Sequence, residues 1–470
     1  MTAGRVMIAA PKSGSGKTIL TCGLLQILKE AGLEPAAYKC GPDYIDPMFH
    51  RTVLGVPGNN LDPFFSEPQE LTEILTACTG RCAVLEGAMG IYDGITGGAF
   101  RKGSCYEVAA VTKTPILLVI DVKGMGMTML SVIRGILADD EESLIRGILL
   151  NRVSEGFYRQ ICCPVEQLLT EISQMRGVPV ELLGGIPVCP DLSLESRHLG
   201  LKRPEEIMGL RAQVAMSAEK IRQYCRVDRI LGIMREAAEL PAPAGTAARR
   251  EAEARPSGDE KMLTLGVARD EAFCFYYEEN LRMLREAGIR ILEFSPVRDE
   301  ALPEDLDGLL LGGGYPELSA AELSANTGML ASIRRAIASG MPSLAECGGF
   351  MLLQQAILDG DTRYPMAGVL EGDCANTGKL RRFGYITVHG NRPETLITGL
   401  SVRGHEFHYY DSTSNGTDAR AEKPGGLSWD CIHAGPRHVW GFPHLWYPSC
   451  PALIRRFAEQ MKAYHGERSK

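Results

Sequence analysis

The chain has 470 residues, of which 45% are hydrophobic and 23% charged, and its net charge at neutral pH is -8. This length exceeds what one hydrophobic core usually serves, so the sequence predicts two or three folded domains rather than a disordered chain. The net charge gives no electrostatic footprint for nucleic acid, whose binding needs clustered Lys and Arg. No apolar stretch reaches the roughly 18 residues of a membrane span.

The first half of the sequence is typical of a parallel sheet covered by helices. Continuous apolar runs predict strands that are buried on both faces: RVMIAA, AVLEG, PILLVID, GILLN and ELLGGIP. Between Thr18 and Gly32 the apolar residues fall close to helical spacing, with Gly32 as the stop. The run from Val6 to Ala10 is too short for a signal-peptide core, and the fourteen cysteines form no C-x-x-C pair. We therefore expect reduced thiols and a cytoplasmic protein.

A phosphate-binding loop, PKSGSGKT, joins the first predicted strand to this helix. Gly14 and Gly16 let backbone N–H groups turn toward phosphate oxygens, Lys17 supplies a positive charge, and the Thr18 hydroxyl can ligate Mg²⁺. Pro11 stands where such loops usually begin with Gly, but the GSGKT chemistry is intact. The alternative is a Gly/Ser-rich turn that only caps a helix; the flanking strand and helix favour the phosphate loop.

Carboxylates follow other predicted strands of this half. Magnesium needs more oxygen ligands than one hydroxyl, and Glu86 ends the run AVLEG at the ligand-binding edge of a parallel sheet. The segment KCGPDYIDPMFH places Lys39, Asp43 and Asp46 in a Gly/Pro-broken loop beyond a short strand. The alternative for Asp43 and Asp46 is that they only cap turns. Asp121, at the end of PILLVID, is a weaker candidate.

Residues 236–260 are rich in Ala, Pro, Glu and Arg, which predicts a flexible, partly helical linker. It separates a domain at residues 1–235 from one at residues 261–470. The second domain again has short apolar runs between amphipathic segments: LTLGVARD, IRILEFSP, GLLLGGG and PSLAECGG. Two α/β domains are therefore expected.

The segment SLAECGGFMLLQQAIL predicts a strand, a sharp turn and a helix, with Cys347 at the turn. This arrangement lifts a nucleophilic thiol above the sheet, and backbone N–H groups at the helix start can hold an oxyanion. A lone Cys-Gly-Gly is weak evidence by itself. The run GLLLGGGYPE strengthens it, because Gly312, Gly313 and Gly314 offer a second loop of backbone donors.

A thiolate nucleophile needs a base, which is most often a histidine. His405 and His408 lie in VRGHEFHYY, which resembles a strand, and their odd separation places them on opposite faces. They are therefore poor joint ligands for a metal. His444, in GFPHLWYP, is the better base candidate, although any single histidine is more often a surface or core residue.

With these residues in hand, the chain resembles the cobyrinic acid a,c-diamide synthase family of corrinoid biosynthesis over nearly its whole length. The resemblance rests on SGSGKT, KCGPDYIDPMFH, NLDPFF, LEGAMGIYDG, GILLNRV, SRHLGL, ARDEAFCFYYEENL, LGGGYPELSAAELSAN, AECGG and RGHEFHYY. It implies an N-terminal P-loop domain, a parallel sheet with helices on both faces similar to dethiobiotin synthetase. It also implies a C-terminal class I glutamine amidotransferase α/β domain.

The resemblance also implies roles for residues. Mg²⁺ is held by Thr18, Asp46 and Glu86. ATP is contacted by Gly14, Ser15, Gly16, Lys17, Thr18, Lys39 and Asn151, the last at adenine. The substrate side includes Asp43, Asp93, Arg197 and His198, and the oxyanion is held by Gly313, Gly314 and Gly348. By the same resemblance Cys347 is the glutaminase nucleophile and His444 its base. Class I domains commonly carry the motif H-x-E, but the third position here is Trp446. The group that orients His444 is therefore left unassigned.

The implied reaction uses three small molecules: ATP, L-glutamine and a corrinoid. ATP phosphorylates a peripheral carboxylate, Cys347 releases ammonia from glutamine, and the ammonia passes inside the protein to the acyl phosphate, once at side chain a and once at c. No nucleic acid or membrane partner is expected. The oligomeric state, including a homodimer, is left open.

Three rival interpretations remain. Cobyric acid synthase amidates other side chains, and GPDYIDP and EAFCFYY argue against it; the related enzyme acting on nickel sirohydrochlorin stays open. A rival from another class is a nucleotide-switch ATPase of the chromosome-partitioning type, suggested by Lys12 before the phosphate loop. Such a switch has no use for Cys347 or for a second α/β domain.

Overall fold

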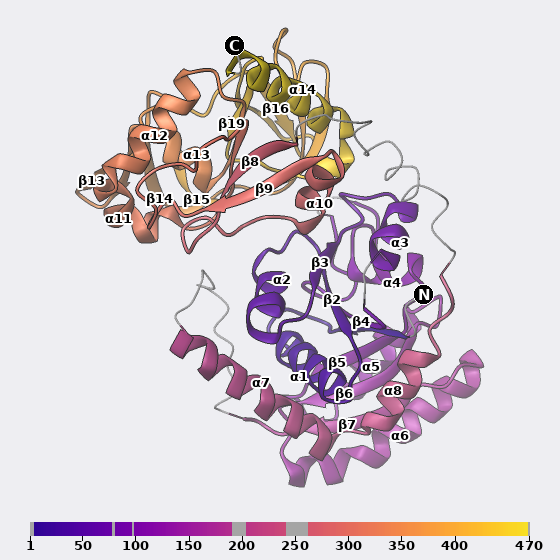
Figure 1. Ribbon diagram of the computed structural model, residues 1–470. Coiled ribbons are helices and arrows are strands. Elements are labelled where there is room, and N and C mark those ends of the chain that lie inside the picture. Colours follow the sequence, from indigo (N-terminus) through magenta and orange to yellow (C-terminus); the bar gives the residue numbers. More distant parts are fainter. Residues whose placement is uncertain (1–3, 78–79, 96–97, 190–203, 241–261, 469–470) are drawn as a thin grey trace. The chain divides into compact units, whose positions relative to one another are not determined.

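The computed structural model describes residues 4–77, 80–95, 98–189, 204–240 and 262–468, and side chains within α7 only from residue 208. The chain forms two compact units (Figure 1), the first from Met1–Leu199 and Arg203–Ala244 and the second mainly from Gly245–Lys470. Every cysteine in the described ranges is a free thiol. None of the helices described has the length and apolar character that a membrane span requires.

The first unit is built on a seven-stranded sheet in the order β3-β2-β4-β1-β5-β6-β7, with every neighbouring pair parallel. Its strands are β1 (Arg5–Ala9), β2 (Pro35–Cys40), β3 (Gly58–Leu61), β4 (Cys82–Glu86), β5 (Ile116–Asp121), β6 (Ile145–Asn151) and β7 (Glu181–Ile186). The five predicted strands of this half are confirmed as β1, β4, β5, β6 and β7. Because all strands are parallel, their carboxyl ends meet at one edge, where such sheets bind ligands.

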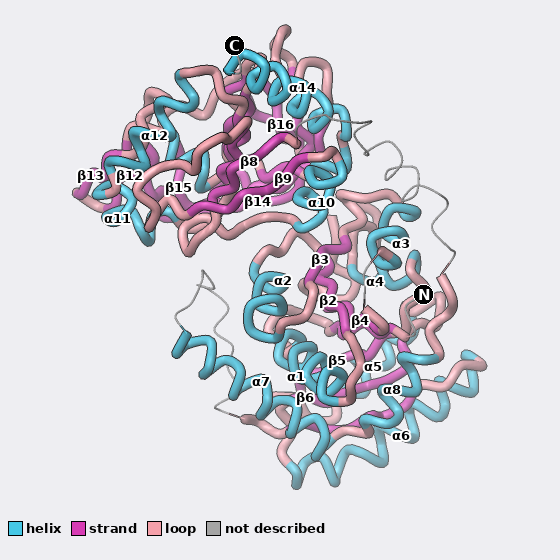
Figure 2. Tube along the Cα trace, in the orientation of Figure 1, coloured by secondary structure: helices cyan, strands magenta, loops and turns pink. Residues whose placement is uncertain are grey.

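Helices cover both faces of this sheet (Figure 2). They are α1 (Lys17–Glu30), α2 (Ile45–Phe49), α3 (Pro68–Thr76), α4 (Cys105–Val111), α5 (Met129–Ala138), α6 (Glu155–Arg176), α7 (Pro204–Tyr224) and α8 (Val227–Arg235), with a π-helical turn η1 (His50–Leu54). Apolar residues of α1, α7 and α8 pack in one core cluster with one face of the central strands. The neighbouring strand residues Met7 and Ile8 are both fully buried, so both faces are covered, as the continuous apolar runs predicted.

Local sequence explains where individual helices begin and end. α6 begins after Ser154, whose side chain accepts a hydrogen bond from the Phe157 N–H, and it ends at Gly177, where φ is 68°. α1 ends at Glu30, just before Gly32, which takes φ of 72° as the predicted stop. Capping and glycine stops therefore fix these boundaries.

The second unit contains two sheets. The first has the order β18-β19-β11-β10-β8-β9 and is parallel except at β18. Its strands are β8 (Leu263–Ala268), β9 (Ile289–Phe294), β10 (Gly308–Leu311), β11 (Ser343–Glu346), β18 (His433–Ala434) and β19 (His438–Gly441). β9 is not buried on both faces. It is an edge strand of the sheet, and its residues Arg290 and Glu293 are exposed.

The second sheet runs β13-β12-β14-β15-β20, with β16 paired to β14 and β17 to β16. Its strands are β12 (Ala356–Asp359), β13 (Thr362–Pro365), β14 (Asp373–Gly390), β15 (Ser401–Ser412), β16 (Ala419–Glu422), β17 (Ser428–Cys431) and β20 (His444–Leu445). The helices of this unit are α10 (Glu278–Glu286), α11 (Ala320–Ala325), α12 (Thr327–Ala338), α13 (Gly348–Leu353) and α14 (Pro451–Arg468), with 3₁₀ turns η3 (Pro316–Ser319) and η4 (Tyr447–Ser449). Of these strands the sequence predicted only β15, as VRGHEFHYY.

Candidate active sites

The phosphate loop lies between β1 and α1, at the carboxyl edge of the first sheet. Gly14 and Gly16 adopt φ of 72° and 92°, the left-handed region that glycine enters without steric cost. A Cβ on Gly16 would lie 2.3 Å from Nδ2 of Asn151, so the close approach also requires glycine. That amide donates to the Ser15 carbonyl oxygen at 2.8 Å. Asn151, at the end of β6, thus supports the loop; its predicted contact with adenine stays a prediction.

Lys17 begins α1, and its ammonium group is held by backbone oxygens. Its Nζ donates to the carbonyl oxygens of Met89 at 2.6 Å and Lys12 at 3.2 Å. The side chain is buried and lines the same cleft as Gly14, Thr18 and Asn151. Burial lowers the pKa of Lys17, and the nearby charge of Lys39 lowers it further. The ammonium therefore lies where a phosphate would be a favourable partner.

Lys39 lies between two carboxylates in the same cleft, and a hydroxyl bonds one of them. Its Nζ lies 2.8 Å from Oε1 of Glu86 and 2.5 Å from Oδ2 of Asp46, and the Thr18 hydroxyl donates to Oε1 of Glu86 at 2.5 Å. Burial alone lowers the pKa of Lys39, but the charges of Asp46 and Glu86 outweigh it and raise the pKa well above its ordinary value. Burial raises the pKa of Glu86. The predicted residues of the metal site are thus brought together.

This set of oxygens fits Mg²⁺. Protein Mg²⁺ sites of nucleotide enzymes commonly use a hydroxyl, one or two carboxylates and substrate phosphates, rather than a cage made only of protein. No group of three or more His, Cys, Asp or Glu side chains gathers as a metal site in the part of the chain that the structure describes. The Lys39 ammonium between Asp46 and Glu86 shows that these carboxylates already accommodate a cation.

Other predicted acidic residues make turns. The sequence predicted a loop at Asp46, but Asp46 lies in the short helix α2. Asp43 precedes that helix. Oδ1 of Asp43 accepts hydrogen bonds from the N–H groups of Ile45 at 2.8 Å and Asp46 at 3.1 Å, the turn-capping alternative. Oδ2 of Asp93 accepts from Gly90 N–H at 2.8 Å. A substrate role for either residue stays a prediction.

Three further predicted residues are Asp121, Arg197 and His198. Asp121 pairs with Arg152 at 2.8 Å, so its carboxylate already has a partner. Arg197 and His198 lie outside the described residues, as does most of the predicted linker.

Cys347 occupies the sharp turn between β11 and α13. Its φ of 47° and ψ of -104° are unfavourable for a residue with a Cβ and hold it in an elbow. The elbow is fixed by the next residues: Gly349 N–H donates to the Gly312 carbonyl oxygen at 2.8 Å, and a Cβ on Gly349 would lie 2.0 Å from the Leu311 oxygen. The prediction of strand, turn and helix is confirmed.

The glycine loop after β10 meets the elbow. The position of a Cβ on Gly348 lies 3.1 Å from the backbone nitrogen of Gly314. The loop after β10 therefore passes close to the elbow, and the role of Gly313, Gly314 and Gly348 as oxyanion donors stays a prediction. Gly313 has another role as well, because a Cβ there would lie 2.2 Å from Cε1 of His444. The histidine ring can approach this loop only because Gly313 has no side chain.

The chemistry at Cys347 is set by burial. Burial raises the pKa of the Cys347 thiol, and the charge of Glu317 raises it further. Burial, with the nearby charges of His405 and His408, lowers the pKa of His444 to about 3. At neutral pH the thiol is thus protonated and the imidazole neutral. Proton transfer between them therefore requires a change in their surroundings when glutamine binds.

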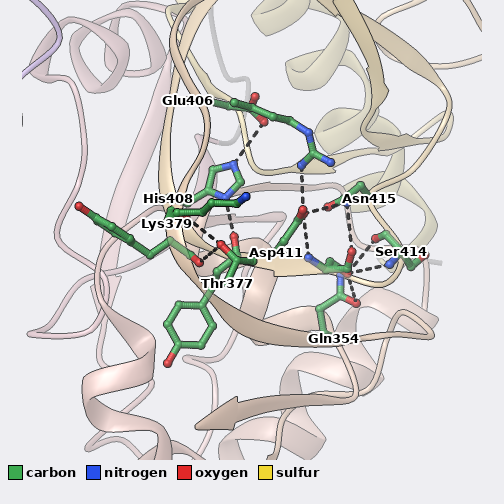
Figure 3. Close-up of polar contacts among 12 residues, drawn as sticks. Gln354, Thr377, Lys379, Glu406, His408, Asp411, Ser414 and Asn415 are labelled. Atoms are coloured by element: carbon green, nitrogen blue, oxygen red, sulfur yellow. Dashed lines mark hydrogen bonds and ion pairs between the residues drawn. The ribbon is translucent and has the colours of Figure 1, made fainter. Parts of the chain in front are cut away.

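The two histidines of β15 lie on opposite faces, as predicted. The His405 ring packs edge-on against Phe383 with centroids 5.5 Å apart, whereas the His408 ring stacks on Phe442 at 4.0 Å. Figure 3 shows His408 directed toward Glu406, with His408 Nε2 and Glu406 Oε1 3.6 Å apart. They do not form a joint metal site.

Sequence reasoning missed two residues beside His444. Glu346, the last residue of β11, has Oε2 at 3.9 Å from Nδ1 of His444. The Tyr447 hydroxyl donates to Oε1 of the same carboxylate at 2.8 Å. The motif AECGG contains Glu346 directly before the nucleophile, and this adjacency was the signal available in the sequence.

Comparisons with known proteins match each of the two units and the chain as a whole. A CobQ/CobB/MinD/ParA nucleotide binding domain matches residues 6–201, and a CobB/CobQ-like glutamine amidotransferase domain matches residues 264–428. Cobyrinate a,c-diamide synthase from Dehalococcoides mccartyi (strain CBDB1) is 37% identical and covers 98% of each chain. The protein of the same name from Priestia megaterium is 33% identical, over 100% of this chain and 99% of its own. Among solved structures, a glutamine amidotransferase covers 42% of this chain and 98% of its own, at 20% identity and a TM-score of 0.32. The chain belongs to the cobyrinate a,c-diamide synthase family.

Proposed function

We propose that this protein amidates the a and c side-chain carboxylates of cobyrinic acid, using ATP and glutamine. The observation that carries the proposal is the presence, in one chain, of a phosphate loop with its acidic cluster and a buried Cys347 elbow with His444. Full-length similarity to cobyrinate a,c-diamide synthases supports the choice of substrate. A nucleotide switch would account for the first site alone.

In the synthetase step, a substrate carboxylate oxygen attacks the γ-phosphorus of ATP, which gives an acyl phosphate and ADP. Lys17 offsets charge on the transferred group, and the phosphate loop supplies backbone donors. Thr18, Asp46 and Glu86 are proposed to hold Mg²⁺, which when bound would neutralise phosphate charge. Ammonia then attacks the acyl carbon, and phosphate leaves as the amide forms.

In the glutaminase step, His444 accepts the thiol proton as Cys347 Sγ attacks the glutamine amide carbon. Backbone N–H groups of Gly314 and Gly348 are proposed to hold the oxyanion. His444 then gives its proton to the departing nitrogen, and ammonia leaves a glutamyl thioester. Water hydrolyses the thioester to glutamate and restores the thiol. The route of ammonia to the acyl phosphate is part of the proposal.

The test is product analysis with rival tetrapyrroles. Purified protein is incubated with ATP, glutamine and either cobyrinic acid or nickel sirohydrochlorin, and the products are analysed by mass spectrometry. We expect two amides on cobyrinic acid, formed with stoichiometric ADP and glutamate. Amidation of nickel sirohydrochlorin alone, or ATP hydrolysis without any glutamate release, would reject the proposal.

A further inference from the structure

Class I glutaminases commonly carry an acidic residue two positions after the catalytic histidine, and here an aromatic residue stands at that position. Two residues after His444 stands Trp446, which is 1% exposed. Its ring packs edge-on against Tyr277 with centroids 5.0 Å apart. An indole cannot accept a proton or balance a positive charge as a carboxylate does. Any acidic partner of His444 must therefore come from another element.

Glu346 reaches His444 from β11, a strand of the other sheet of this unit. It ends β11, directly before the nucleophile Cys347, and its Oε2 lies 3.9 Å from Nδ1 of His444. Both side chains are largely shielded from water, at 11% and 2% exposure. Burying a carboxylate is costly unless it is hydrogen-bonded or paired, so its position beside the base needs an explanation.

The carboxylate and the histidine are held by a network of hydrogen bonds. The Tyr447 hydroxyl donates to Oε1 of Glu346 at 2.8 Å, and the Leu445 N–H also hydrogen-bonds this carboxylate. Asn280 of α10 fixes the segment that follows His444: its Nδ2 donates to the Leu445 oxygen at 2.7 Å, and its Oδ1 accepts from the Tyr447 N–H at 2.9 Å. Glu346 thus has one oxygen anchored by Tyr447 and the other directed to His444.

We propose that Glu346 is the positioning residue that orients His444 during glutamine hydrolysis. This inference rests on the proposed glutaminase role of Cys347 and His444. A carboxylate at Nδ1 keeps the proton on that nitrogen, leaves Nε2 as the proton acceptor, and balances the imidazolium that forms when the thiol is deprotonated. The separation of 3.9 Å exceeds a hydrogen bond, but catalytic contacts are often long before substrate binds.

If Glu346 acts as a carboxylate, the rate of glutamine hydrolysis depends on its ionisation and therefore on pH. Burial raises the pKa of Glu346 to about 8, against the lowering effect of the Tyr447 hydrogen bond. Further titratable groups facing this pair are Tyr276 and Cys347 near Glu346, and His405 and His408 near His444. A protonated carboxyl cannot hold a proton on Nδ1, so glutamine hydrolysis should be slow below pH 8 and rise through it.

The experiment compares Glu346→Gln and Glu346→Asp with the wild type in the full chain. Glutamate release from glutamine is measured across roughly pH 6 to 10, which brackets the ionisation of Glu346 near 8. Ammonium-driven amide formation is measured in parallel. Glu304→Gln, an exposed glutamate before β10 at the other end of the sheet, is the matched control. A Tyr447→Phe variant removes the anchor of the carboxylate while leaving the carboxylate in place.

We expect Glu346→Gln to lower kcat for glutamine about 100-fold or more, with KM little changed and the rise near pH 8 lost. Glu346→Asp should recover part of kcat, and Tyr447→Phe should move the rise to higher pH. Ammonium-driven synthesis should stay intact in all of them, which shows a folded chain. If Glu346→Gln keeps the kcat and the pH profile of the wild type, the inference is wrong. If the wild type itself releases no glutamate, the proposed function fails instead.

Discussion

Among the described residues no carboxylate forms an ion pair with the ammonium group of Lys17, and its hydrogen bonds go to the Met89 and Lys12 carbonyl oxygens. The Lys39 ammonium instead pairs with Asp46 and Glu86 in this structure. We therefore expect Lys17→Ala to lower the rate of ATP-dependent amide formation by about 100-fold or more. The measurement is amide product per unit time with ammonium as the nitrogen source, so that the glutaminase does not enter.

Lys113→Ala is the matched control for the Lys17 variant. Lys113 is exposed, pairs with Glu142 at 2.7 Å and lies before β5, at the opposite edge of the sheet from the phosphate loop. Its loss should leave the rate within a factor of about two, as for most surface substitutions. If the Lys17 and Lys113 variants form amide at equal rates, Lys17 does not belong to the phosphate site.

The loop that follows β10 is the element that sets the position of His444. Gly313→Ala would place a Cβ 2.2 Å from Cε1 of the ring, so the ring or the loop must shift. A displacement of about 1 Å at a reacting group can cost on the order of 100-fold in rate, and we expect a glutaminase loss of that order. Gly425→Ala, at a glycine with open space around it, is the control, and glutamate release is the measurement. Normal release by the Gly313 variant would mean that His444 is not held by this loop.

Elements built from continuous apolar runs could be predicted from the sequence, because strands buried on both faces have no polar alternation. β14 could not be predicted in this way. Within it the residues from Asn376 to Gly384 are mostly exposed and none is fully buried, and its pairing is interrupted by register shifts. β9 gave a misleading signal, because its apolar run lies at an edge. Strand pairing between distant segments decides such cases, and a local pattern does not contain it.

In the candidate sites too, some residues could be predicted from the sequence and others could not. Residues at strand ends, such as Glu86 and Cys347, could be placed because parallel strands share one carboxyl edge. That Lys39 lies between Asp46 and Glu86 could not be predicted, since it depends on how α2 folds back over β2. Glu346 was missed because the acidic partner of His444 was sought after it, whereas the carboxylate comes from another strand, β11.

At the scale of the whole molecule, each unit has its own hydrophobic core and its own candidate site. Cys347 and Lys17 belong to different units. If glutamine serves only to deliver ammonia, removing the thiol leaves the site for ATP and substrate complete. Loss of one activity should then be separable from loss of the other.

Cys347→Ala tests this separation directly. We expect it to abolish glutamine-dependent amidation, because no nucleophile remains, while added ammonium chloride restores amide formation to near the rate of the wild type with ammonium. The attacking species is unprotonated ammonia, so the restored rate should rise with pH through the neutral and mildly alkaline range. Product is followed by mass spectrometry with each nitrogen source, and Cys163→Ala, at an exposed cysteine, controls for the loss of a thiol. Retained glutamine-dependent synthesis in Cys347→Ala would show that the nucleophile lies elsewhere. Failure with ammonium in a folded, ATP-binding variant would show that the two units do not work independently.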